Sequence, residues 1–207
     1  MGPGGTYALV TFVAGLLALL GWLYLTTENS RSGAMLKSSA LIFALPIVFS
    51  PIDASILGMW LWVPCEEGLK AFASTREKRP ANKFWLVALF GIWELALSKP
   101  LGGLTIAQSG EFWDRWALSA LLYATVLPVL MHTVTAAIYA FVFEKRLWAA
   151  FIVSWIVHLS FNGAVDYFYP SVSAVIIETV VLGAILVGIL PWQARKDGQP
   201  LSIQRIE

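Results

Sequence analysis

The sequence has few charged residues and almost no cysteine. Asp, Glu, Lys and Arg make up 13% of the 207 residues, about half the share found in a soluble globular domain, so the composition excludes an ordinary water-soluble fold. The formal net charge is +1, which provides no basic surface for phosphates and predicts no nucleic-acid partner. Cys65 is the only cysteine, which excludes an intrachain disulfide and a cysteine-rich metal site.

Apolar residues dominate instead. Hydrophobic residues make up 58% of the chain, and its ten Trp and six Tyr have amphipathic rings that suit a membrane interface. This composition predicts an all-α, polytopic bundle of transmembrane helices. We expect a single integral membrane domain over residues 1–207, with the lipid bilayer as its surroundings. The sequence contains no visible internal repeat.

Seven apolar runs are separated by charged or turn-rich stretches. They cover residues 7–25, 41–50, 56–74, 84–106, 117–143, 147–168 and 172–190. The second run is too short to cross about 30 Å of hydrocarbon unless its helix begins near Lys37. We expect residues 27–37 to form a polar loop. The pattern therefore predicts about seven spans, or six if the second and third runs form one bent helix.

Basic residues indicate how the spans are oriented. Lys and Arg are concentrated between the first two runs, in residues 75–83, in the turn 144–146 and after the last run. Such an excess is typical of cytoplasmic loops. These segments all fall on one side if a tight turn near Pro51 separates the second and third runs. The pattern predicts an outside N-terminus and a cytoplasmic C-terminus. We expect the membrane to be the plasma membrane of a prokaryote.

Four ionisable residues inside the apolar runs share one depth. They are Glu66, Glu94, His132 and His158, each in a different run. At about 1.5 Å rise per residue, all four lie roughly 14–18 Å from the cytoplasmic loops. A centred charge costs roughly 2.5–3.5 kcal/mol on insertion scales. A layer of such groups therefore indicates a functional site near the middle of the membrane.

Helical spacing predicts how neighbouring polar residues assist this layer. Lys70 follows Glu66 by four residues and Glu67 by three, so either carboxylate can pair with its ammonium group. Glu66 and Glu67 project about 100° apart, and we expect that they do not both face the same site. His158 and Asn162 share one helical face. Lys99 is expected to extend outward toward the membrane surface.

Peptide-bond hydrolysis would use these groups. It needs a base that activates water and donors that stabilise the developing oxyanion. Glu66 beside a histidine suits the first task, and His158 with Asn162 suits the second. The sequence contains no GxSxG motif and no HExxH motif, so we expect no cofactor. Two histidines and a glutamate are still a possible ligand set for Zn²⁺ with an open water position.

Four short motifs resemble those of the PrsW family of intramembrane proteases. Glu66-Glu67-Gly-Leu-Lys70 resembles its EExxK motif, and Phe90-Gly-Ile-Trp-Glu94 is similar to its second motif, an aromatic–Gly pair followed by Glu. Met131-His132-Thr and His158-Leu-Ser-Phe-Asn162 resemble the third and fourth. The ordered set covers roughly residues 63–164. The same clan includes the CAAX prenyl endopeptidases, bacterial immunity-type homologues and the non-catalytic scaffold subunit of γ-secretase.

The resemblance implies a glutamate-dependent mechanism. Glu66 and His132 would act on the water, His158 and Asn162 on the oxyanion, with Glu67, Lys70 and Glu94 in support. CAAX-type members place an arginine one position later than Lys70, where this chain has Ala71, and an aromatic where it has Pro128. The clan's older description as metalloproteases leaves zinc as the alternative to a metal-free site.

The expected activity is cleavage of a membrane-anchored peptide or protein from a cavity that opens to the cytoplasmic half of the membrane. Two other functions fit the same residues. One is a non-catalytic scaffold or binding subunit, and the other is a proton-coupled transporter in which the Glu and His side chains relay protons. Transporters of that kind often contain inverted repeats, and none is visible here. The sequence gives no signal for an oligomeric state.

Overall fold

The computed structural model describes residues 3–26, 32–49, 57–101, 125–168 and 172–196. These residues form helices, with short turns at 76–79 and 143–146 and no strand among them. The order is α1 (Pro3–Leu25), α2 (Ser32–Phe49), α3 (Leu57–Thr75), α4 (Pro80–Trp93), η1 (Glu94–Ser98), α7 (Leu127–Ala137), η2 (Ile138–Val142), α8 (Leu147–Phe168) and α9 (Val172–Lys196). The segments η1 and η2 are π-helical turns that continue α4 and α7. The expected all-α fold is therefore correct for the described residues.

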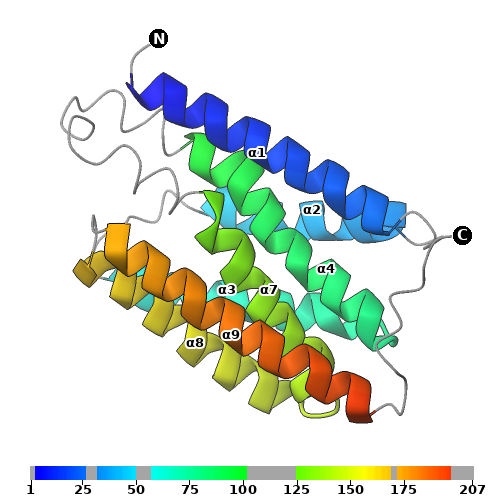
Figure 1. Cartoon of the computed structure of the whole chain (residues 1–207). Coiled ribbons are helices and arrows are strands. Elements are labelled where there is room, and N and C mark those ends of the chain that lie inside the picture. The colour runs from blue at the N-terminus through cyan, green and yellow to red at the C-terminus, as the bar shows by residue number, and fades with distance from the viewer. Residues whose placement is uncertain (1–2, 27–31, 50–56, 102–124, 169–171, 197–207) are drawn as a thin grey trace, which may run out of the picture.

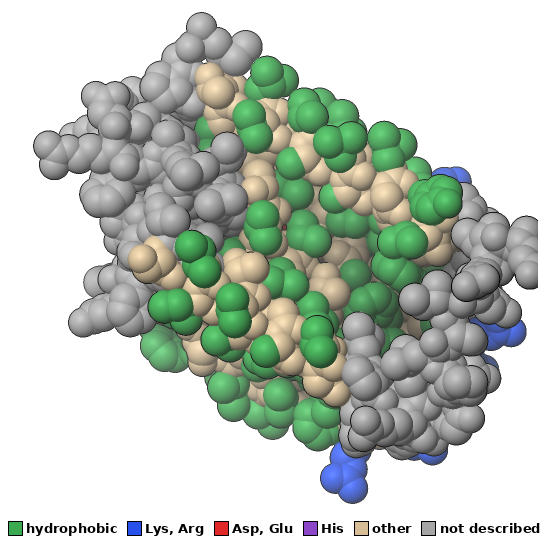
Figure 2. Space-filling view, in the orientation of Figure 1, with side chains coloured by type: hydrophobic (Ala, Val, Ile, Leu, Met, Phe, Trp, Pro, Cys, Tyr) green, Lys and Arg blue, Asp and Glu red, His purple; other side chains and the backbone are tan. Residues whose placement is uncertain are grey.

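Three helical segments are long and apolar enough to cross a membrane, and they are Gly5–Leu25, Pro80–Leu101 and Leu147–Ala164. Two further apolar segments, Leu127–Val142 and Ile176–Ile189, are shorter. Hydrophobic side chains cover the face drawn in Figure 2, whereas its visible Lys and Arg side chains lie at one end. These features are compatible with a membrane protein.

Helix α4 is central in the bundle. It packs against α7, α1, α2 and α3, while α8 packs on α3, and α9 on α7 (Figure 1). One apolar cluster is built mainly from α4, α7, α8 and α9. A second joins α1, α2, α3 and α4. Helices α3 and α4 contribute residues to both clusters, so they lie where the two apolar clusters meet.

Predicted and observed boundaries agree best for α8, whose described range is the predicted 147–168. The loop expected over residues 27–37 is wrong in its second half, because α2 already begins at Ser32. The Ser32 hydroxyl donates to the Thr26 carbonyl at 2.5 Å and links the start of α2 to the end of α1. Helices α2 and α3 pack against each other. The Pro51 turn and residues 102–124, including part of two predicted runs, lie outside the described residues.

Two glycines allow unusually close helix contacts. A Cβ built on Gly91 would lie 2.9 Å from the Cβ of His132 and 3.0 Å from the Cα of Val129, so the absence of a side chain lets α4 and α7 touch beside His132. A Cβ on Gly15 would lie 2.5 Å from the Cα of Ala96. Helix α1 therefore rests directly on the π-helical turn η1.

Candidate functional site

The four groups that the sequence places at one depth meet between α3, η1, α7 and α8. His132 Nε2 lies 2.8 Å from Glu94 Oε2 and 3.4 Å from Glu66 Oε1. The His132 and His158 rings meet edge to face, with centroids 5.7 Å apart. Residues from four helical segments thus form one polar cluster inside an otherwise apolar bundle.

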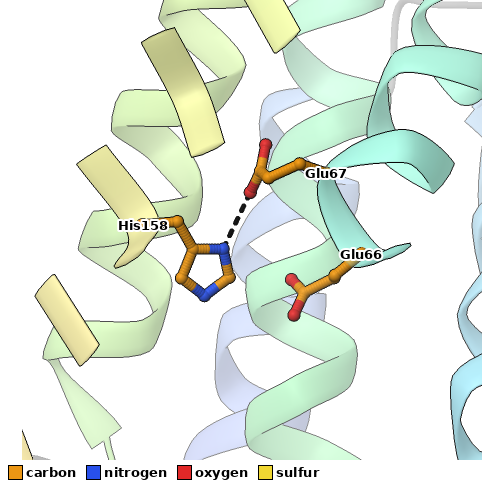
Figure 3. Close-up of side chains that lie close together, drawn as sticks. All are labelled: Glu66, Glu67 and His158. Atoms are coloured by element: carbon orange, nitrogen blue, oxygen red, sulfur yellow. Dashed lines mark hydrogen bonds and ion pairs between the residues drawn. The ribbon is translucent and has the colours of Figure 1, made fainter. Parts of the chain in front are cut away.

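Glu67 has the most contacts in this cluster, and its side chain is fully buried. Its Oε1 accepts from Lys70 Nζ at 2.5 Å and lies 2.8 Å from His158 Nδ1. The hydroxyl of Tyr139 donates to the Glu67 carbonyl at 3.0 Å and lies 3.4 Å from Oε2. Figure 3 shows this carboxylate directed from α3 toward the His158 ring. Glu67 thereby links α3 to α8 and to the turn η2.

The expectation that Glu66 and Glu67 do not face the same site is wrong. Both carboxylates reach the ammonium group of Lys70, at 3.1 Å and 2.5 Å, and both are directed toward the space beside His158 (Figure 3). Adjacent Cα–Cβ directions do differ by about 100° on an α-helix. The cation lies one turn further along, between the two directions, so two flexible side chains converge on it.

The expectation that Lys99 extends outward is also wrong. Its Nζ pairs with Glu94 Oε1 at 2.9 Å, and only 19% of its side chain is exposed. The Lys99 backbone N–H bonds to the Glu94 carbonyl, five residues earlier, as in a π-helix. This wider turn brings Lys99 over Glu94, whereas an α-helix would rotate it by about 140° from Glu94.

Tyr139 is a site residue that the sequence reading missed. It is buried in η2 and lies seven residues, or about two helical turns, after His132. The same face of α7 and η2 thus carries both residues, and that spacing is the signal from which Tyr139 was identifiable. π-Helical turns are frequent at functional sites, and both such turns in the described residues carry a member of this cluster.

Asn162 stands apart from these contacts. It is half-buried on α8, one turn beyond His158. Asn162 takes part in none of the hydrogen bonds and ion pairs of the cluster within the described residues. Those contacts join Glu66, Glu67, Lys70, Glu94, Lys99, His132, Tyr139 and His158. No contact within the described residues therefore links Asn162 to the cluster, and its expected role in binding the oxyanion stays a prediction.

The charges of the cluster nearly balance. Three carboxylates, from Glu66, Glu67 and Glu94, face two ammonium groups, from Lys70 and Lys99. If both histidines are neutral, one negative charge is in excess. An unbalanced charge in a buried site is costly, and one additional proton on a histidine would neutralise the cluster.

A metal ion is poorly matched to these residues. Glu66, Glu67 and His158 each offer a ligand atom, and the three atoms lie within 4.8 Å of one another. However, the Lys70 ammonium contacts both carboxylates and supplies the positive charge that a divalent ion would bring. A Zn²⁺ ion there would have to displace or repel Lys70. His132, which belonged to the suggested zinc ligand set, instead pairs with Glu94.

Comparisons with protein-family models, with curated proteins and with solved structures find no match to this chain.

Proposed function

We propose that this protein is an intramembrane endopeptidase of the PrsW type, which hydrolyses a peptide bond of a membrane-anchored substrate in the plasma membrane of a prokaryote. The bundle would cross the membrane about seven times, with the C-terminus in the cytoplasm. The observation that supports the proposal most directly is the position of Glu66. Its buried Oε1 lies 3.1 Å from Lys70 Nζ as an ion pair and 3.4 Å from His132 Nε2. It makes no hydrogen bond in the described part of the chain, so it can still accept a hydrogen bond from the attacking water.

The proposed reaction begins with Glu66. Its carboxylate accepts a proton from water, and the water oxygen bonds to the carbonyl carbon of the substrate. The negative charge that develops on the carbonyl oxygen accepts hydrogen bonds from His158 and from the Asn162 amide. Glu66 then gives its proton to the amide nitrogen as the carbon–nitrogen bond breaks. His158 Nδ1 bonds to Glu67, so the ring donates through Nε2 when it is the protonated, charge-balancing histidine.

A non-catalytic scaffold is the second candidate. It is favoured by the internal pairing of the charges, since Lys70 contacts two carboxylates and Lys99 contacts the third. Such a network can stabilise a helix bundle without any substrate, because interhelical hydrogen bonds hold membrane helices together.

The deciding experiment compares the wild type with Glu66→Gln in liposomes that carry a library of membrane-anchored peptides. The amide keeps the shape of the carboxylate but does not accept the proton, so cleavage should fall by about 10²–10⁴-fold. The melting temperature should stay close to wild type, since Lys70 keeps Glu67 as a partner. Glu178→Gln, the same change in α9 and outside the cluster, is the control. A wild type that cleaves nothing, with Glu66→Gln retaining the biological phenotype, would favour the scaffold.

A further inference from the structure

The Glu94 carboxylate divides its two oxygens between a cation and a histidine. Oε1 faces Lys99 Nζ at 2.9 Å, and Oε2 faces His132 Nε2 at 2.8 Å. The π-helical turn η1 produces this arrangement, because it places Lys99 over Glu94 instead of around the helix from it. Lys99 and Glu94 are also partly exposed, at 19% and 21% of their side chains, whereas His132 is fully buried. The pair thus lies between the buried histidine and the outside of the cluster.

The two nitrogens of His132 have different surroundings. Nε2 has a carboxylate at hydrogen-bond distance, whereas Nδ1 is buried and has no partner among the described residues. A hydrogen on Nδ1 would be an unsatisfied buried donor, and in an imidazolium it would also carry charge. A neutral ring with its hydrogen on Nε2 avoids both costs.

We propose that Lys99 is a positioning residue, which fixes Glu94 so that this carboxylate holds His132 as the neutral Nε2–H tautomer. The additional proton that balances the cluster then resides on His158, whose Nδ1 bonds to Glu67. This arrangement extends the proposed function and rests on it for its catalytic meaning. The Nε2 hydrogen of His132 is directed to Glu94 at 2.8 Å and not to Glu66 at 3.4 Å. Glu66 Oε1 then has the ion pair with Lys70 at 3.1 Å and can still accept from the water.

The protein contains two histidines, so ¹⁵N-histidine labelling gives a spectrum of two imidazoles. We would record it on the full chain in lipid bilayers and assign it with His132→Gln. The expected wild-type spectrum shows His132 with one protonated nitrogen, Nε2, and a bare Nδ1, and His158 with both nitrogens protonated. A hydrogen on His132 Nδ1 would overturn the proposal. This measurement requires no proteolysis, so it is independent of the proposed function.

Variants test the part played by Lys99. Lys99→Gln removes the cation and should produce a mixture of His132 tautomers, while Lys99→Arg should restore the wild-type signals. Lys83→Gln is the matched control, since Lys83 lies in α4, the helix that η1 continues, and contacts the Glu144 carbonyl at 3.4 Å outside the cluster. If Lys99→Gln does not fold, Glu94→Gln is measured instead and should give the same mixture. An unchanged His132 spectrum in the folded variant refutes the role of Lys99.

The catalytic consequence is read separately. In an active preparation, Lys99→Gln should lower kcat at unchanged KM, which marks the loss of an interaction that matters in the transition state. The correct tautomer in a wild type without peptidase activity would support the positioning role and refute the proposed function. Peptidase activity in a protein whose His132 is protonated on Nδ1 would support the proposed function and refute the positioning role.

Discussion

The carboxylate of Glu67 and the imidazole of His158 meet at 2.8 Å, although 91 positions separate the two residues in the sequence. The contact joins α3 to α8 in a fully buried environment, and the ammonium group of Lys70 lies on the same oxygen at 2.5 Å. A carboxylate with two such partners holds the bundle together at the level of the proposed site. Its neighbour Glu66 has longer contacts and an oxygen without a hydrogen bond in the described residues.

Glu67→Gln should therefore act through stability. Removing one partner of a buried charged pair costs about 3–5 kcal/mol, and the change leaves both Lys70 and His158 without their shared negative charge. The free energy of unfolding in mixed micelles measures the effect. Glu178→Gln is the matched control, because the buried Glu178 Oε1 has no hydrogen-bond partner within the described residues and a neutral amide is cheaper to bury. Equal stability of the two variants would contradict a structural role for Glu67.

Gly91→Ala should destabilise the protein by about 1–3 kcal/mol, the usual cost of overpacking. The new Cβ would lie 2.9 Å from the Cβ of His132, so α4 and α7 would have to separate beside the cluster. Gly183→Ala in α9 is the control, since its Cβ would meet nothing within 4 Å and alanine favours a helix by about 1 kcal/mol. The prediction fails if both alanine variants unfold at the same denaturant concentration.

Sequence reasoning located the convergence of Glu66, Glu94, His132 and His158, because depth along a helix follows from a constant rise per residue. The sequence did not predict correctly the direction in which side chains project around the helix axis. The π-helical turn after Trp93 moved Lys99 from an expected outward position to the carboxylate of Glu94. No feature of the local sequence signals such a turn, whose Ala96 lies against Gly15 of another helix.

The length of side chains caused the second error. Glu66 and Glu67 differ in direction at Cβ, but each has three further bonds with which to reach Lys70. The directions of the Cα–Cβ bonds alone therefore miss contacts that long charged side chains can make. The catalytic roles themselves remain predictions, because a static arrangement of charges is shared by a peptidase and by a scaffold.

Tyr139→Phe should lower the free energy of unfolding by about 0.5–1.5 kcal/mol, the net value of one hydrogen bond. The hydroxyl donates to the Glu67 carbonyl at 3.0 Å, and phenylalanine leaves that buried oxygen without this donor. Because the hydroxyl is also 3.4 Å from Glu67 Oε2, its loss should couple with Glu67→Gln. A double variant whose destabilisation equals the sum of the two single changes would show that Tyr139 acts on the carbonyl alone.

The topology can be tested through a contact between two turns. Lys83 Nζ donates to the Glu144 carbonyl at 3.4 Å, so the turn before α4 and the turn before α8 lie at the same end of the bundle. Both turns are basic, and the excess of Lys and Arg predicts that this end is cytoplasmic. Single cysteines at Lys78 and Lys145, in a Cys65→Ser background, should therefore both react with a membrane-impermeant thiol reagent in inverted vesicles and in neither case on intact cells.

The opposite end provides the control for this labelling. Helix α8 has 22 residues, and at about 1.5 Å per residue it spans about 33 Å. The exposed Ser173 at the start of α9 therefore lies on the far side from Lys145, and Ser173→Cys should react on intact cells. Labelling of positions 78 and 145 from opposite sides would invalidate the shared depth of the four ionisable residues, and with it the location of the proposed site within the membrane. Labelling of both from the inside, with position 173 outside, would place Glu66 and His132 about half-way along helices that cross from one side to the other.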